Sequence, residues 1–206
     1  ILIQVYALIR HRRELPTNIV FMGMGEPFYN YDAVIRAADL LHRKPGLALG
    51  ARHITISTAG VIPGLERFIA EEQPYNLAIS LNVPHEANRS ALMDINRRYA
   101  LSDLLKVAAR FTRELRRKIT FEYIMMPGYN MDADSLQNLI QIARPLRCRI
   151  NLIPLNTDFE GFRPPTQLEA EEFQRALRQA GILAFNRGNP GKKIHGACGM
   201  LALKMV

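Results

Sequence analysis

The chain has 206 residues, of which 48% are hydrophobic, which is enough to bury the core of one soluble domain. Two cysteines do not make a disulfide framework, no apolar run is long enough to cross a membrane, and no leader sequence is seen, so a cytoplasmic protein is expected. The net charge of +8 favours an anionic partner, nucleic acid first, although each basic cluster taken alone has the plainer explanation of a solvated helix end.

The first segment, residues 1–13, has the apolar spacing of a helix but no capping residue at its start, which we interpret as a cut from a longer protein. Strands are expected where apolar or β-branched runs end in polar turns, at 18–22, 52–57, 76–82, 119–125, 149–153 and 182–185. Helical spacing predicts helices between them, at 31–42, 62–72, 101–116, 133–143 and 167–180. A long loop is expected over 83–100.

Strands and helices alternate with a period of roughly 30 residues, and each strand reads as a nearly continuous apolar run, as expected when both faces are covered. This pattern predicts a parallel α/β sheet of repeated βα units, either open or closed into a barrel. A dinucleotide-binding fold is disfavoured because Gly23 and Gly25 lack the third glycine of its fingerprint, and the chain has no phosphate loop ending in Gly-Lys-Ser or Gly-Lys-Thr.

Polar residues gather where four of the expected strands end. In a βα barrel these ends converge on one mouth, and glycines there let the backbone approach a ligand closely. One polar strand end is ordinary turn chemistry, but four suit the binding of a polar small molecule. The residues concerned are Gly25 with Glu26, Ser57, Ser80 with Asn82, and Asn156.

Several stretches, in order along the chain, resemble the RlmN family of radical S-adenosylmethionine enzymes, which methylate C2 of an adenine in 23S rRNA and in some tRNAs. They are Gly23-Met24-Gly25-Glu26-Pro27, Ser57-Thr58-Ala59-Gly60, Ser80-Leu81-Asn82, Pro154-Leu155-Asn156 and Ala197-Cys198-Gly199. The resemblance implies S-adenosylmethionine and a [4Fe-4S] cluster as cofactors and an electron donor for the cluster. It implies 23S rRNA as substrate, with tRNA as a further candidate, and no membrane partner.

The resemblance also implies which residues bind the cofactor: Gly25, Glu26, Ser57, Ser80, Leu81, Asn82 and Asn156. Glu26 would accept hydrogen bonds from the methionine amino group, and residues 80–82 would line the ribose. Cys198 corresponds to the catalytic cysteine that is methylated and then donates the methyl group. Its flanking glycines and basic tail favour a reactive thiolate, although a lone cysteine is more often a small buried hydrophobe. Cys148 lies in a strand pattern and is expected in the core.

The fold implied is a partial (βα)6-type radical SAM barrel with parallel strands, a single domain over residues 1–206 whose tail, 187–206, carries Cys198. Its first strand and its cluster loop are missing, because the family's Cys-x-x-x-Cys-x-x-Cys sequence does not occur in the chain. We therefore expect no metal ligands within these residues, and a chain that alone is inactive and marginally stable. Asn82 stands where the family usually has His, and Gly196 and Met200 replace Ala and Gln beside the cysteine.

Three other functions stay open on the sequence. A sister group methylates C8 of adenine and confers resistance to ribosome-targeting antibiotics, although Gly25-Glu26-Pro27 and Ser57-Thr58-Ala59-Gly60 favour the C2 branch. A non-catalytic remnant that binds S-adenosylmethionine or RNA would also explain the missing cluster loop. A sugar-phosphate barrel enzyme would need phosphate-binding glycine loops after its late strands, and only Gly188 and Gly191 suggest them.

Overall fold

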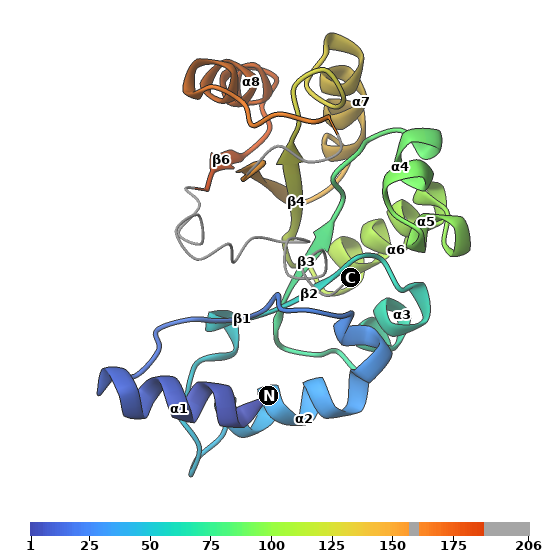
Figure 1. Ribbon diagram of the computed structural model, residues 1–206. Helices are drawn as coiled ribbons and strands as arrows, with labels where there is room; N and C mark the ends of the chain where they lie inside the picture. The colour runs from blue at the N-terminus through green and yellow to red at the C-terminus, as the bar shows by residue number, and fades with distance from the viewer. Residues whose placement is uncertain (157–160, 188–206) are drawn as a thin grey trace.

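The computed structural model describes residues 1–156 and 161–187. Its centre is a parallel sheet of six strands whose spatial order follows the chain order (Figure 1). The two edge strands are short, and β1 and β6 lie at opposite edges, so the sheet is open. This confirms the predicted parallel α/β sheet of repeated βα units, in its open form. The strands are β1 (Ile19–Phe21), β2 (Ile54–Thr58), β3 (Asn76–Ser80), β4 (Ile119–Met125), β5 (Cys148–Pro154) and β6 (Ala184–Asn186).

Most helices agree with the sequence pattern, and those over 31–42 and 133–143 have the predicted bounds. Where the ends differ, the terminal residues lie in caps and turns that apolar spacing does not resolve. The helices are α1 (Leu2–Arg12), α2 (Tyr31–His42), α3 (Ile62–Ala70), α4 (Glu86–Leu92), α5 (Ile95–Arg98), α6 (Leu101–Glu114), α7 (Ala133–Ala143) and α8 (Gln167–Gln179), with 3-10 turns η1 (Pro27–Asn30) and η2 (Ala51–His53). No helix in the described ranges is long and apolar enough to span a membrane.

The expectation of a long loop over 83–100 is wrong, because α4 and α5 lie there. Helices this short are unstable alone and need tertiary contacts. Here the contacts come from Asn96 on α5, whose amide donates to Glu86 Oε1 at 2.6 Å and to Ser90 Oγ at 2.7 Å on α4. The pattern of the segment is polar, so periodicity gave no sign of it.

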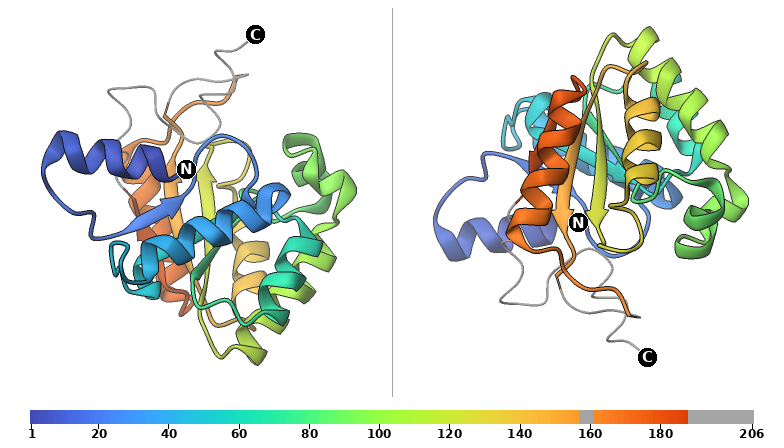
Figure 2. Two further views of the ribbon diagram at one scale, coloured as in Figure 1. Left: turned by 90° about the horizontal axis from the view of Figure 1, so that it is seen from below. Right: turned by 90° about the horizontal axis from the view of Figure 1, so that it is seen from above.

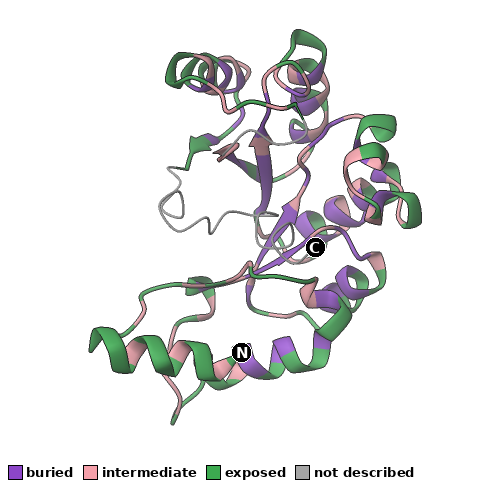
Figure 3. Ribbon diagram, viewed as in Figure 1, coloured by how far each residue is buried: buried purple, intermediate pink, exposed green. Residues whose placement is uncertain are grey.

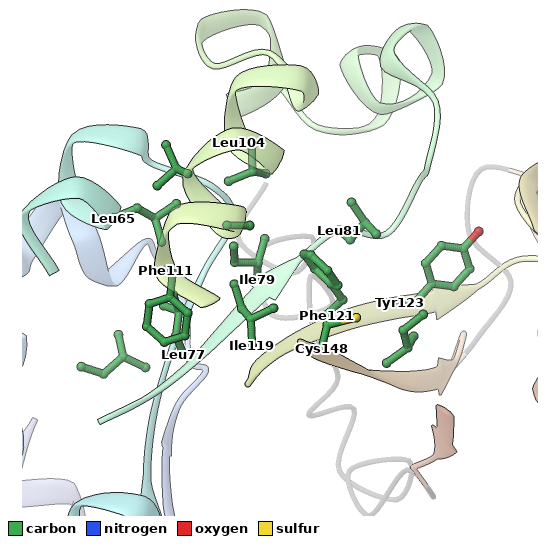
Figure 4. Packing of buried hydrophobic residues seen from close by; sticks show 14 of the residues in the cluster. Leu65, Leu77, Ile79, Leu81, Leu104, Phe111, Ile119, Phe121, Tyr123 and Cys148 are labelled. Atoms are coloured by element: carbon green, nitrogen blue, oxygen red, sulfur yellow. The ribbon is translucent and has the colours of Figure 1, made fainter. Parts of the chain in front are cut away.

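One face of the sheet is apolar and packs against α2, α3, α6, α7 and α8, which lie along that side (Figures 1 and 2). Leu77, Ile79, Phe121 and Ile150 are fully buried there, and Figure 4 shows the first three of them facing side chains of α3 and α6. Burial is concentrated on the central strands and on the inward sides of these helices, whereas α1 has no buried residue (Figure 3). The apolar face therefore holds the core.

The opposite face of the sheet is polar, which corrects the prediction that the strands are apolar on both sides. Side chains alternate across a strand, so residues that pair in register share a face. Ser80 pairs with Glu122, and Glu122 pairs with Asn151 across the next gap. Earlier along the strands, Thr120 pairs with Arg149 on the same face. We call this surface the inner face, and the helix-covered surface the outer face.

Candidate cofactor site

The turn after β1 places Glu26 between two strand ends. The carboxylate is partly buried; its Oε1 accepts from the backbone N–H of Phe28 at 3.0 Å, which caps η1, and its Oε2 accepts from that of Ala59 at 2.7 Å, in the loop after β2. Gly25 precedes it with a φ of 87°, a left-handed conformation that favours glycine. The carboxylate is thus fixed by two amides, and its remaining lone pairs can accept from an ammonium group.

Arg89 on α4 joins the ends of β2 and β3. Its side chain is fully buried and donates to the carbonyls of Ala59 at 2.8 Å, Ser80 at 3.1 Å and Leu81 at 3.1 Å, and to Asn96 Oδ1 at 2.5 Å. Burial lowers the pKa of Arg89 to about 10, which still leaves it protonated near neutral pH. A buried cation with four oxygen acceptors is held rigidly, so it fixes the strand ends relative to one another.

Asn130 makes the corresponding link between β3 and β4. Its amide N–H groups donate to the carbonyls of Asn82 at 2.8 Å and Ile124 at 2.6 Å, and its Oδ1 accepts from the N–H of Met126 at 2.8 Å. The residue is fully buried. Glu26, Arg89 and Asn130 therefore connect four successive strand ends into one rigid edge, which is the edge at which open α/β sheets bind ligands.

The structure brings the predicted residues of β2 and β3 to this edge in different ways. Ser57 is buried on the inner face and Ser80 is partly buried on it. Asn82 has a φ of 56°, and its Oδ1 accepts from the N–H of Ile124 at 3.4 Å. The Leu81 side chain, however, is fully buried in the apolar core, so only its backbone can contribute to a ligand site.

Two buried polar atoms near this edge have no hydrogen-bond partner among the described residues: Asn156 Nδ2 after β5, and Glu122 Oε2 in β4. One is a donor and the other, as a carboxylate oxygen, an acceptor. Buried polar groups are normally paired, so each such exception needs an explanation. A polar ligand that offers both acceptors and donors, as S-adenosylmethionine does, fits these residues.

The two cysteines belong to different parts of the chain, and the structure describes one of them. Cys148 is buried at the start of β5, as predicted; its Sγ donates to the carbonyl of Ala143 at 3.4 Å, and burial raises its pKa to about 11, so the thiol is inert. Cys198 lies outside the described residues, as do Gly196 and Met200. Within the described ranges, His, Cys, Asp and Glu form no group of three or more that could hold a metal ion. These residues do not fit an iron–sulfur cluster by themselves.

A concave region of about 410 Å³ lies between the loop after β4 and helix α8, away from these strand-end residues. Two of its carboxylates are already engaged. Asp132 accepts from the N–H of Ser135 at 2.7 Å and caps α7, while Glu169 forms the capping box of α8 with Thr166 and an ion pair with Arg163. We therefore place the candidate site at the strand ends and not in this groove.

The sequence pattern missed Arg89, Asn130, Glu122 and Asn151. Arginine is rarely buried, so an arginine in the loop expected over 83–100 gave no sign of a buried role for Arg89. Glu122 did leave a signal, because an acidic residue in the middle of the buried run Ile119–Met125 is unusual and alternates with Thr120 at the spacing of one strand face. That alternation predicts a polar inner face.

A parallel sheet with helices on its outer face and a polar ligand edge formed by strand ends defines the class of partial-barrel α/β proteins. A family model described as "Radical SAM superfamily" matches residues 2–140, and the chain belongs to this superfamily. Its fold matches the crystal structure of a radical SAM methyltransferase from Sphaerobacter thermophilus with a TM-score of 0.90 and 40% identity, covering 96% of this chain and 59% of that one.

Sequence relatives give a narrower likeness. The chain is 55% identical, over 91% of its length, to a protein of Leptospira interrogans serovar copenhageni named "Probable dual-specificity RNA methyltransferase RlmN", and covers 53% of it. It is 52% identical, over its whole length, to a protein of the same name from Leptospira biflexa, and covers 59% of that protein. These names confirm the resemblance to RlmN. The chain spans little more than half the length of the curated relatives it matches.

Proposed function

We propose that this chain forms the S-adenosylmethionine-binding core of a radical SAM enzyme that methylates C2 of an adenine in 23S rRNA, and in tRNA as a further substrate. The observation that carries the proposal is the rigid edge at which Glu26, Arg89 and Asn130 hold four strand ends together. Its likeness to RNA methyltransferases of the RlmN name supports the substrate class.

In this proposal the residues of the edge bind and orient the cofactor. Glu26 accepts from the methionine ammonium, with Gly25 leaving room for the backbone approach. Ser57, Ser80 and the backbone of Leu81 line the side nearest the ribose, together with Asn82. Asn156 donates from the end of β5 through the buried Nδ2 that has no protein partner among the described residues. When bound beside a reduced [4Fe-4S] cluster, S-adenosylmethionine supplies the methyl group and the one-electron chemistry that activates an unreactive carbon.

The proposed methyl carrier is Cys198, through an S-methylcysteine intermediate, as the resemblance implies. The cluster ligands, the second cysteine that releases the product and the electron donor are not provided by this chain. RNA is a polyanion, and the net charge of +8 favours its approach. Exposed arginines at the carboxyl side of the sheet, Arg97 and Arg98 on α5, are suited to phosphate contacts. A cytoplasmic location follows from such a substrate.

The test is methylation of a 23S rRNA fragment by the full-length protein with its cluster reconstituted, read out by mass spectrometry of the digested nucleosides. We expect 2-methyladenosine, and we expect Cys198→Ala to abolish it. Cys148→Ala is the matched control, because its thiol is buried behind the sheet and should leave the product unchanged. Activity that survives Cys198→Ala would overturn the proposed methyl carrier.

The product also separates the alternatives. 8-Methyladenosine would assign the chain to the sister group that methylates C8. Binding of S-adenosylmethionine without any methylated product from the reconstituted full-length protein would favour a non-catalytic binding protein. Glu26→Gln should weaken S-adenosylmethionine binding in either case, and an unchanged affinity would remove Glu26 from the site.

A further inference from the structure

Glu122 lies in the middle of β4 on the inner face, and its side chain is only 5% exposed. Its Oε1 accepts from Asn151 Nδ2 at 2.9 Å, on the paired residue of β5. Its Oε2 is buried and has no hydrogen-bond partner in residues 1–156 and 161–187. One oxygen of the carboxyl group is thus oriented by a hydrogen bond, while the other has no partner in this part of the chain.

A carboxyl group in this position is not explained by the fold. The inner-face neighbours Arg149 and Arg187 are close enough to act on Glu122 electrostatically, but Arg149 Nε donates to Thr120 Oγ1 at 2.8 Å and both arginines are exposed. Burial outweighs them and raises the pKa of Glu122. A threonine or valine would fill the strand without this cost, so the second oxygen points to a missing partner.

The position of Glu122 indicates which partner it would meet. In the register of β3 and β4, Glu122 is directly opposite Ser80, and side chains of paired residues on one face lie about 5 Å apart. The Glu122 carbonyl also accepts from the N–H groups of Leu81 at 3.0 Å and Asn82 at 3.2 Å. The carboxyl group is therefore tied, through backbone and register, to the segment 80–82, which is proposed to line the ribose.

We propose that Glu122 is a further ligand-binding residue whose Oε2 accepts hydrogen bonds from the ribose hydroxyls of the bound nucleoside, with Asn151 as the positioning residue that orients the carboxylate. Carboxylates bind ribose hydroxyls in the same way in dinucleotide-binding folds. This inference rests on the proposed function, since it takes the nucleoside to be that of S-adenosylmethionine. It adds a contact from β4, a strand to which no cofactor role has been given.

The experiment is isothermal titration of the full-length protein, with its cluster reconstituted, with S-adenosylhomocysteine and with its 2′-deoxy and 3′-deoxy analogues, which needs no turnover. For the wild-type protein we expect removal of the hydroxyl that faces Glu122 to weaken binding about tenfold to a hundredfold, as for a lost hydrogen bond to a charged group. In Glu122→Leu we expect the affinity for S-adenosylhomocysteine to fall by a similar factor and the penalty for the deoxy analogues to vanish.

Thr120→Val is the matched control, because Thr120 lies on the same face of β4, two residues earlier, and its hydroxyl accepts from the exposed Arg149. It should keep both the affinity and the deoxy penalty. Should Glu122→Leu fail to fold, Glu122→Gln keeps the bond to Asn151 and should show a reduced deoxy penalty, since a neutral amide binds a hydroxyl less strongly than a carboxylate does.

The outcomes separate the two proposals. If wild-type protein does not bind S-adenosylhomocysteine, the proposed function fails and this inference with it. If wild-type protein binds it and the deoxy penalty is as large in the Glu122 variants as in the wild type, the proposed function stands and the role of Glu122 is refuted. A purely structural role for Glu122 could lower all affinities equally, but it could not remove discrimination between ligands that differ by one hydroxyl.

Discussion

The two faces of the sheet are built from the same strands, but one face is apolar and the other is polar. On the outer face, residues such as Ile79 and Phe121 are fully buried against helices and join one continuous apolar core. On the inner face, Glu122 is almost as deeply buried, yet one of its oxygens has no partner among the described residues. Among residues 1–156 and 161–187 the apolar groups of the outer face pack against one another, whereas the inner face holds a buried oxygen that the proposed ligand would pair.

The outer face of this fold provides most of its stability, and the inner face provides the groups available to a ligand. Burial of apolar groups on the outer face stabilises the sheet in proportion to the area removed from water. Polar groups on the inner face stabilise it little, and an unpaired one destabilises it. An unpaired polar group kept on the inner face at such a cost is therefore a candidate for a ligand contact, and replacing it should have the opposite effect on stability from truncating a core side chain on the outer face.

The largest effect is expected on the outer face. Phe121→Ala should lower the free energy of unfolding by about 3–5 kcal/mol, because it removes a fully buried ring and leaves a cavity between β4 and the helices. Urea unfolding followed by circular dichroism would measure it. Phe185→Ala is the control, since Phe185 is 44% exposed at the sheet edge and should cost about 1 kcal/mol or less. Equal costs at the two sites would contradict the division between the faces.

The next effect concerns Arg89, whose polar atoms are fully engaged. Arg89→Met should destabilise by about 2–4 kcal/mol, because it removes the charged donor that the carbonyls of Ala59, Ser80 and Leu81 share. Arg89→Lys should not restore the loss, since a compact ammonium cannot reach acceptors arranged around a planar fork. The exposed Arg97 provides the control, and Arg97→Met should change stability by no more than about 0.5 kcal/mol. The readout is again urea unfolding.

Glu122→Gln should raise the free energy of unfolding, whereas Phe121→Ala and Arg89→Met lower it, and the size of the increase should depend on pH. The pKa of Glu122 is raised in the folded protein, so below its ordinary value of about 4.3 both states are protonated and no penalty arises. Above that value the unfolded chain loses its proton while the folded chain still holds it, so wild-type stability falls as the pH rises toward the raised pKa. Glutamine has no such proton. The variant should therefore gain stability relative to the wild type as the pH rises from about 4 toward 7.

Unfolding in urea at about pH 4, 5.5 and 7 would check this, because the gain of Glu122→Gln over the wild type should be small at the lowest pH and grow with pH. Asn151→Leu removes the hydrogen bond that orients the carboxyl group of Glu122, but Glu122 can still titrate. The stability of this variant should therefore still depend on pH. A difference that stays constant across the three pH values would show that the titration of Glu122 does not contribute to stability.

The smallest effect is expected for Thr120→Val on the inner face. It removes the acceptor for Arg149 Nε, but Arg149 is exposed and can bond water instead. The expected loss is about 0.5 kcal/mol. Thermal unfolding monitored for this variant beside Phe121→Ala compares adjacent residues on opposite faces of one strand. A loss approaching that of Phe121→Ala would mean that the inner face also carries the core.

Periodicity predicted the elements with strong apolar repeats, and β4, α2 and α7 have the bounds expected from the sequence. It did not find α4 and α5, because these short helices are held by Arg89 and Asn96 and not by an apolar stripe of their own. It also placed the last strand too early, since β6 begins at Ala184. Local pattern does not encode which residues of a short edge strand reach their neighbour.

The candidate site also combines features that the sequence predicted with features that it could not predict. Sequence placed Gly25 and Glu26 at a strand end because turn residues follow an apolar run, and the structure has them there. The bond from Ala59 to Glu26 could not be predicted, because it depends on how two loops approach each other in space. The family resemblance named Leu81, yet the alternation of β3 turns its side chain into the core. A motif identifies positions, whereas the strand pleat decides which of their atoms are available.

Asn82 shows how backbone geometry limits which residue types fit at a proposed binding position. Its φ of 56° lies in the left-handed region, where asparagine, histidine and glycine are tolerated and β-branched residues are strongly disfavoured. The exchange of the family's usual His for Asn therefore needs no change of the chain path. An imidazole and an amide can therefore occupy this position on the same backbone, and they differ in whether the side chain can carry a proton near neutral pH.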